Sequence, residues 1–247
     1  MDAAPEVQLR LLDLQDIDAA LTRLAARRRS LPEHAEIEQS TARLAQLSAE
    51  LGDASTLAAQ IGREQTRLEG EVEVIRGRTE RDQKRLDAGA VSSSKELENL
   101  QSEIASLGRR QGALEDDLLE VMERAEEAQG RVSVLTADRD ETLRGRDEAV
   151  ARRDAAVAAI DAEAAERRQA REAVAAELPA ELTGLYDKIR ASSGGVGAAR
   201  LSRRRCEGCH LELAGTDLAE LAAAPPQRVV RCEECRRILV RTPESGL

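Results

Sequence analysis

Four cysteines near the C-terminal end are the residues whose types and spacing most clearly indicate chemistry. They form two Cys-x-x-Cys pairs separated by 22 residues: Cys206, Cys209, Cys232 and Cys235. A Cys-x-x-Cys turn brings two thiolates to one ion, and four thiolates complete the tetrahedral shell that Zn²⁺ prefers. Because four protein sulfurs leave no position for water, we predict one structural Zn²⁺ and no catalytic metal.

Besides zinc binding, the first cysteine pair could serve haem attachment or redox chemistry. Cys206, Cys209 and His210 match the Cys-x-x-Cys-His pattern for attachment of c-type haem. That chemistry usually follows export, and the opening segment lacks the basic and apolar regions of a signal peptide. Haem would also leave Cys232 and Cys235 unexplained, and neither pair follows the βαβ pattern of a redox dithiol. We therefore expect His210 to lie at the surface or beside the metal shell, but not in it.

Short stretches of strand type flank the cysteine pairs. Residues 196–201 lead into the first pair, residues 228–231 lead into the second, and residues 237–241 follow it. Between the pairs, Thr216 is an N-cap residue for a short helix that ends before Pro225. The pattern predicts a zinc ribbon. A module with so small a core should take much of its folding free energy from the metal.

The predicted ribbon is the basic part of an acidic chain. The net charge of the chain is −10, whereas residues 200–241 hold nine arginines against six acids, a net charge of +3. Four thiolates and Zn²⁺ together lower this to about +1. Phosphate binding requires such charges, but the ribbon has no aromatic ring for base stacking, and the alternative is solvated arginines around a metal site. The candidate nucleic-acid face consists of Arg203, Arg204, Arg205, Arg228, Arg231, Arg236, Arg237 and Arg241.

The elements that carry this module are helices. Charged residues make up 34% of the chain, and Tyr186 is its only aromatic residue, a composition typical of coiled coils. From Leu97 to Leu135, alternating steps of three and four residues meet an apolar side chain at eleven of twelve positions, which predicts a coiled-coil seam. A similar stripe covers residues 37–86. A third stripe precedes Pro32, which ends the first helix at residue 30 or 31.

Stop and start signals occur together between the two long stripes. Gly89 can take the left-handed conformation that ends a helix. Ser93 and Glu96 then form a capping box that opens the next helix. We expect the stripes to fold back as an antiparallel hairpin with its tip at about residues 89–95. The alternative is a parallel dimer of continuous helices, interrupted at residues 89–94.

The predicted fold is therefore mainly α-helical: a long antiparallel coiled-coil hairpin with a small C-terminal zinc ribbon of short β-strands. Residues 1–178 would form the hairpin, residues 179–199 a short helix and linker, and residues 200–243 the ribbon. Pro179 suits the first turn of the short helix. Tyr186 should pack between the coil and the ribbon.

Signatures of enzymes and of membrane proteins are absent from the sequence. It contains no phosphate-binding loop, no HExxH motif and no nucleophile elbow. No stretch approaches the ~20 apolar residues that span a bilayer. We expect a non-enzymatic, cytoplasmic protein that makes no membrane contact and is a monomer or a dimer.

The whole constellation resembles the C4-type zinc-ribbon coiled-coil family of bacteria, over nearly the full chain. The segments that carry the resemblance are SSSKELENLQSEI at the tip, LPAELTGLYDKIR in the short helix, and CEGCHLEL and VVRCEECRRILVR in the ribbon. The resemblance implies a helical hairpin with a zinc ribbon whose four cysteines bind the metal. Its better-understood members regulate flagellar or type III secretion genes by binding an alternative sigma factor, and in some cases messenger RNA. Arg236 departs from the family pattern, because ribbon turns often carry glycine there.

Three functions are compatible with these features. The first is an adaptor in gene regulation whose ribbon contacts nucleic acid or a protein, the resemblance implying a sigma factor or another transcription component. The second is an RNA-polymerase-binding factor whose hairpin tip acts near the catalytic magnesium. This role fits poorly, because the tip offers three serines and Lys95, with Glu96 and Glu98 just inside the helix. The third is a structural scaffold.

Overall fold

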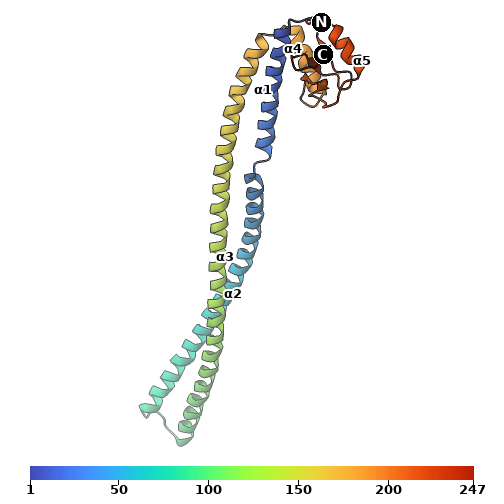
Figure 1. The fold of residues 1–247 in the computed structure, drawn as a ribbon. Helices are drawn as coiled ribbons and strands as arrows, with labels where there is room; N and C mark the ends of the chain where they lie inside the picture. The colour runs from blue at the N-terminus through green and yellow to red at the C-terminus, as the bar shows by residue number, and fades with distance from the viewer. The chain divides into compact units, whose positions relative to one another are not determined.

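The computed structural model describes residues 1–247 and has the predicted fold, a helical hairpin with a small C-terminal sheet (Figure 1). Contacts group the chain into two units, which we call the coil unit (residues 35–150) and the ribbon unit (residues 1–34 and 151–247). The three-part division given above stays a prediction. The elements are α1 (Pro5–Arg29), α2 (Glu33–Asp87), α3 (Ser94–Ala176), α4 (Ala180–Ser192), β1 (Ala198–Ser202), β2 (Arg205–Cys206), α5 (Gly215–Ala223), β3 (Val230–Arg231) and β4 (Ile238–Val240).

The coil unit is an antiparallel pair formed by α2 and the first part of α3 (Figure 1). Ile61 and Leu68 of α2 are buried against Val121 and Ala128 of α3, at positions of the predicted stripes. Ion pairs cross the seam with opposite chain directions: Arg43 pairs with Asp138 at 2.7 Å, and Arg85 pairs with Glu96 at 3.8 Å. The hairpin is therefore confirmed over the parallel arrangement.

The helix ends at the hairpin tip follow the local signals. Gly89 has φ +61°, the left-handed conformation predicted for it. The Ser93 hydroxyl accepts a hydrogen bond from the Glu96 amide at 3.2 Å, as in a capping box. The Glu96 carboxylate reaches back one residue further than predicted, to the amide and the hydroxyl of Ser92 at 3.0 and 3.1 Å. These bonds from Ser92 lower the pKa of Glu96.

The helix boundaries near Pro32 and Pro179 lie within one residue of their predicted positions. The first helix ends at Arg29 with Ser30 as its C-cap residue, just before Pro32. The short helix starts at Ala180, and Pro179 is the N-cap residue rather than part of the first turn. The Pro179 carbonyl still accepts the amides of the first turn, so the proline fixes where the helix begins.

The ribbon unit contains a four-stranded sheet in the order β2-β1-β4-β3. β1 and β4 are parallel, and each pairs with its outer neighbour in the antiparallel sense. The three predicted stretches form β1, β3 and β4, and the two-residue β2 was not predicted. The predicted N-cap at Thr216 is wrong, because α5 begins at Gly215 with Ala214 as its cap residue. The Leu213 amide bonds the Arg204 carbonyl and so holds the chain extended up to Ala214.

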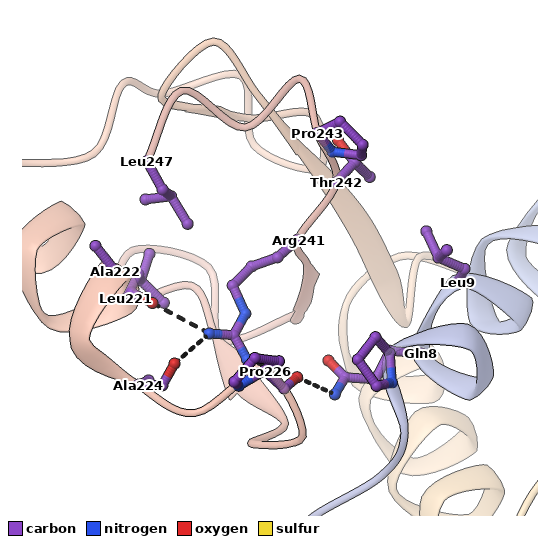
Figure 2. Close-up of a pocket in the computed structure, with 11 residues that line it drawn as sticks. Gln8, Leu9, Leu221, Ala222, Ala224, Pro226, Arg241, Thr242, Pro243 and Leu247 are labelled. Atoms are coloured by element: carbon purple, nitrogen blue, oxygen red, sulfur yellow. Dashed lines mark hydrogen bonds between the residues drawn. The ribbon is translucent and has the colours of Figure 1, made fainter.

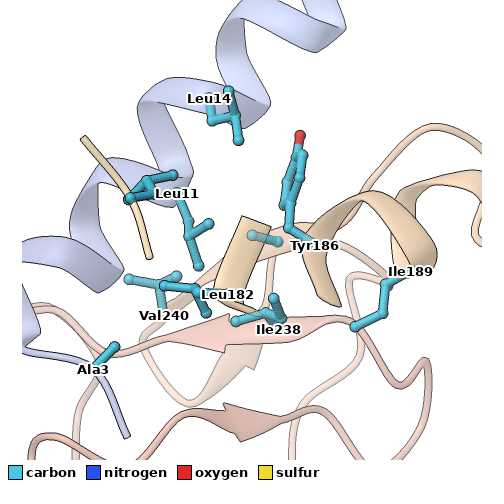
Figure 3. Packing of buried hydrophobic residues seen from close by; sticks show 10 residues of the cluster. Ala3, Leu11, Leu14, Leu182, Tyr186, Ile189, Ile238 and Val240 are labelled. Carbon is cyan, nitrogen blue, oxygen red and sulfur yellow. The ribbon is translucent and has the colours of Figure 1, made fainter. Parts of the chain in front are cut away.

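The sheet lies between two small apolar cores because residues along its strands alternate between faces. Ile238 and Val240 of β4 face Leu11 of α1 and Tyr186 of α4 (Figure 3). Leu239 belongs to the opposite cluster, which includes α5 and the cysteines. The centre of the sheet therefore packs against helices on one side and against the metal module on the other.

Tyr186 is fully buried between α1 and β4, as predicted. Its hydroxyl donates a hydrogen bond to the Asp18 carboxylate at 2.8 Å, and burial raises its pKa. Asp18 is itself buried and forms ion pairs with Arg171 of α3 at 2.8 Å and Arg190 of α4 at 3.2 Å. This network satisfies a charge that would otherwise be costly to bury.

Candidate metal centre and nucleic-acid interface

The four cysteine side chains converge on one point. All four Sγ atoms lie within 4.8 Å of one another, and the Cys206–Cys235 and Cys209–Cys232 Sγ distances are both 3.9 Å. A tetrahedron with Zn–S bonds of 2.3 Å has sulfurs about 3.8 Å apart, whereas a disulfide needs about 2.05 Å. The cluster therefore fits one Zn²⁺ held by four sulfurs.

The two Cys-x-x-Cys turns have the same backbone geometry. The amide two residues after Cys206, that of Gly208, points at the Cys206 sulfur at 3.4 Å. The residue after each pair, His210 or Arg236, has φ +61°, and its amide donates to the carbonyl of Cys206 or Cys232 at 2.7 or 2.8 Å. A left-handed residue thus closes both turns, although a non-glycine residue there costs about 1 kcal/mol. This explains why such turns often carry glycine at the position of Arg236.

His210 contributes its backbone rather than its ring. The side chain is exposed, and the four sulfurs already form the cluster without it. His210 therefore matches the haem-attachment motif only because it is the residue that follows the first Cys-x-x-Cys turn.

Arg237 joins the first turn to the chain that leads into β1. Its guanidinium donates to the carbonyls of Ser193 at 2.7 Å, Gly208 at 3.1 Å and Val196 at 3.2 Å. Sequence reasoning missed this role, because these partners lie 29 to 44 residues away along the chain.

The protein environment affects the cysteine thiols unequally. Burial raises the pKa of Cys206 to about 12. Burial also acts upward on Cys235, but hydrogen bonds from the backbone and side chain of Arg237, together with those to Cys232 and Cys209, outweigh it and lower the pKa to about 7. The site therefore supplies donors that stabilise negative charge on sulfur, which suits thiolate ligands of a cation.

Most arginines of the candidate nucleic-acid face are engaged within the protein. Arg241 donates to five carbonyls, including those of Leu221 and Ala224, and is one of the residues that line a groove of about 530 Å³ (Figure 2). Its remaining bonds close the segment around Pro226. The other engaged members and their partners are Arg228 with Asp2, Arg231 with the Arg236 carbonyl, Arg236 with Glu233, and Arg237 as described.

Arg203, Arg204 and Arg205, which we call the arginine turn, differ from the rest. All three side chains are exposed, and none makes an ion pair or side-chain hydrogen bond in the structure. Ser202 pairs with Arg205 across the β1–β2 hairpin, so Arg203 and Arg204 form a two-residue loop. Both have positive φ angles, +48° and +66°, which defines the type I′ geometry usually supplied by Asn-Gly. Two arginines there cost about 1–2 kcal/mol each.

Two family models match this chain, one over the helical part and one over the ribbon. Residues 14–194 match the CT398-like coiled coil hairpin domain, and residues 205–239 match the C4-type zinc ribbon domain. Protein Rv2229c of Mycobacterium tuberculosis is 39% identical over 245 residues, which cover 98% of each chain. Protein ML1638 of Mycobacterium leprae is 29% identical over 224 residues, 90% of this chain and 94% of that protein.

Solved structures have the same fold. A Mycobacterium smegmatis protein superposes with a TM-score of 0.83 at 34% identity, covering 98% of this chain and all of that one. CT398 of Chlamydia trachomatis gives a TM-score of 0.63 at 16% identity, with 96% and 98% covered, and shows the fold alone. None of the helices is both long enough and apolar enough to cross a membrane.

Proposed function

Because the chain belongs to the family of CT398-like coiled-coil hairpin proteins with a C4-type zinc ribbon, we propose that it is a non-enzymatic adaptor in bacterial gene regulation. In this proposal the ribbon binds the phosphates of nucleic acid through the arginine turn. The coiled coil binds a protein partner. The resemblance noted above suggests an alternative sigma factor or another transcription component for that role.

The metal has a structural role in this proposal. Cys206, Cys209, Cys232 and Cys235 are its ligands, and four sulfurs provide a closed shell that crosslinks the two turns. Strand β1 pairs with β4 and with β2 next to these turns. The arginine turn therefore lies at the end of a folded β1–β2 hairpin.

The observation that carries the proposal is the contrast between the arginine turn and the other basic residues. Arg203, Arg204 and Arg205 are adjacent, exposed and unpaired, whereas the remaining members of the predicted face bond within the protein. Three neighbouring guanidinium groups can each contact a backbone phosphate and displace a counterion.

Salt-dependent binding tests this role. Replacing the three arginines of the turn by glutamine should weaken binding of a labelled DNA duplex or RNA strand in a gel-shift assay. It should also reduce the slope of log K against log salt by about 1 per lost phosphate contact.

A second arginine triplet provides a matched control. Arg27, Arg28 and Arg29 are exposed at the end of α1 in the same unit, so their replacement by glutamine removes the same charge. Arg28 also forms an exposed ion pair with Asp161 at 3.5 Å. This variant should keep nearly the parental affinity and slope. Equal losses in both variants would show a non-specific charge effect and reject the proposed interface.

The hairpin tip gives less support to the role inside an RNA polymerase channel. Both acids that flank the loop are engaged: the Asp87 carboxylate accepts a hydrogen bond from the Gln83 side chain, and the Glu96 carboxylate accepts two from Ser92. A carboxylate engaged as a helix cap has less freedom to bind a catalytic magnesium ion, so the adaptor role is the better supported of the two.

A further inference from the structure

Residues 242–246, which we call the tail, run directly behind the arginine turn. The Arg203 amide donates to the Glu244 carbonyl at 2.8 Å, and the Arg204 amide donates to the Ser245 carbonyl at 2.8 Å. A two-residue hairpin loop leaves these two amides outside the strand ladder. The tail therefore provides hydrogen-bond partners to the two residues whose backbone is left-handed.

Ser245 anchors the tail to the sheet. It is only 2% exposed, and its hydroxyl donates to the Leu201 carbonyl at 3.0 Å. The same hydroxyl accepts the Thr242 amide at 2.8 Å, while the Ser245 amide donates to the Thr242 carbonyl at 3.0 Å. Both hydrogen-bonding capacities of the buried side chain are thus used to fold the tail back onto β1.

Gly246 completes the contact from the other side of the tail. It has φ +72°, and a Cβ at this position would lie 3.2 Å from Cγ of Arg204. A side chain there would therefore strain the tail backbone and press on the arginine.

We propose that the tail is a clamp that holds the arginine turn in its left-handed conformation and thereby sets the affinity of the ribbon for nucleic-acid phosphates. Ser245 is the positioning residue of this clamp. The effect on affinity rests on the proposed function, whereas the effect on the backbone of the turn does not. Left-handed arginines are unfavourable by themselves, so their persistence requires the bonds that the tail supplies.

Two substitutions in the zinc-loaded full chain test the clamp. Ser245→Ala removes the anchoring hydroxyl, and Gly246→Ala disturbs the tail from its exposed side. Amide hydrogen exchange, measured by NMR, should become about fivefold faster at Arg203 and Arg204, as expected for loss of one hydrogen bond. Ser192→Ala is the control, because that serine bonds only within its own helix, to the carbonyls of Lys188 and Ile189.

The dissociation constant for a labelled DNA duplex provides the second readout. It should rise in both tail variants and stay unchanged in Ser192→Ala, with the zinc content of all proteins equal. If Ser245→Ala fails to fold, Gly246→Ala still decides the question, because it leaves the buried anchor in place.

The outcomes separate the clamp from the proposed function. Unchanged exchange at Arg203 and Arg204 would overturn the clamp whether or not nucleic acid binds. Faster exchange with an unchanged dissociation constant would overturn its influence on affinity. If the parental protein bound no nucleic acid, the proposed function would fail, and the exchange rates alone would decide whether the tail holds the turn.

Discussion

Four residues other than glycine have positive φ angles in the ribbon, and they fall into two groups. His210 and Arg236 occupy equivalent positions after the two cysteine pairs, where the turn geometry demands that conformation. Arg203 and Arg204 lie in a hairpin loop that Asn-Gly would serve at lower cost. The first group is explained by the metal site. The second group is explained by a binding role of the two guanidinium groups, because backbone strain that is retained at an exposed loop is typical of functional sites.

Gly197 is a residue at which the packing of the ribbon unit can be tested. A Cβ there would lie 2.7 Å from both the ring and the backbone carbonyl of Tyr186. Gly197→Ala should therefore destabilise the protein by about 1–3 kcal/mol through overpacking, measured by thermal or denaturant unfolding.

Gly184→Ala is the matched control for that substitution. Gly184 lies within α4, and no atom comes within 4 Å of a Cβ built there. The change should stabilise the helix by up to about 1 kcal/mol. Destabilisation of equal size at both positions would contradict the packing described around Tyr186.

Individual elements differ in how much of them the sequence reveals. The hairpin could be predicted because its signals are local in sequence. Each long helix has its own periodic apolar stripe, and Gly89 and Ser93 mark the helix ends at the tip. The roles of Arg237 and Arg241 could not, because their carbonyl partners come from loops distant in sequence. The eight arginines have similar sequence contexts and were therefore predicted to form one face. Only the fold shows which of them bond within the protein and which have free side chains.

The same limit applies to the elements around the sheet. The tail has no distinctive motif, and burial of Ser245 depends on where β1 and β2 place the Leu201 carbonyl. The burial and ion pairs of Asp18 could not be predicted either, because its partners come from α3 and α4.

Zinc removal should affect the elements unequally. The four cysteines share an apolar cluster with the sheet and with α5. The helix α5 has only 9 residues, against 55 in α2 and 83 in α3. A chelator should therefore change the near-UV circular dichroism of Tyr186, which packs on β4, while far-UV helicity falls only slightly.

Restoring Zn²⁺ should bring the tyrosine signal back. A parallel collapse of both signals would show that the coil depends on the metal for its own folding, contrary to the separate apolar clusters of the two units.

At the scale of the whole molecule, the chain combines an acidic coil with a basic metal module. The chain as a whole has net charge −10, yet its exposed and unpaired arginine triplet lies on a ribbon held by four cysteines. Under the proposed function, the arginine turn would bind nucleic acid and the acidic coil unit would bind a protein. We propose that the arginine turn is retained for phosphate binding at the expense of stability.

Exchanging Arg203 and Arg204 for Asn-Gly, the sequence that best fits a type I′ loop, separates the effect on stability from the effect on binding. The double substitution Arg203→Asn with Arg204→Gly should raise the free energy of unfolding by about 1–2 kcal/mol, because Asn-Gly favours the type I′ conformation. The same variant, with its zinc content unchanged, should bind a labelled DNA duplex more weakly, with a salt slope reduced by about 2. A variant that is more stable and binds with the parental affinity and salt slope would show that the strained arginines are not retained for binding.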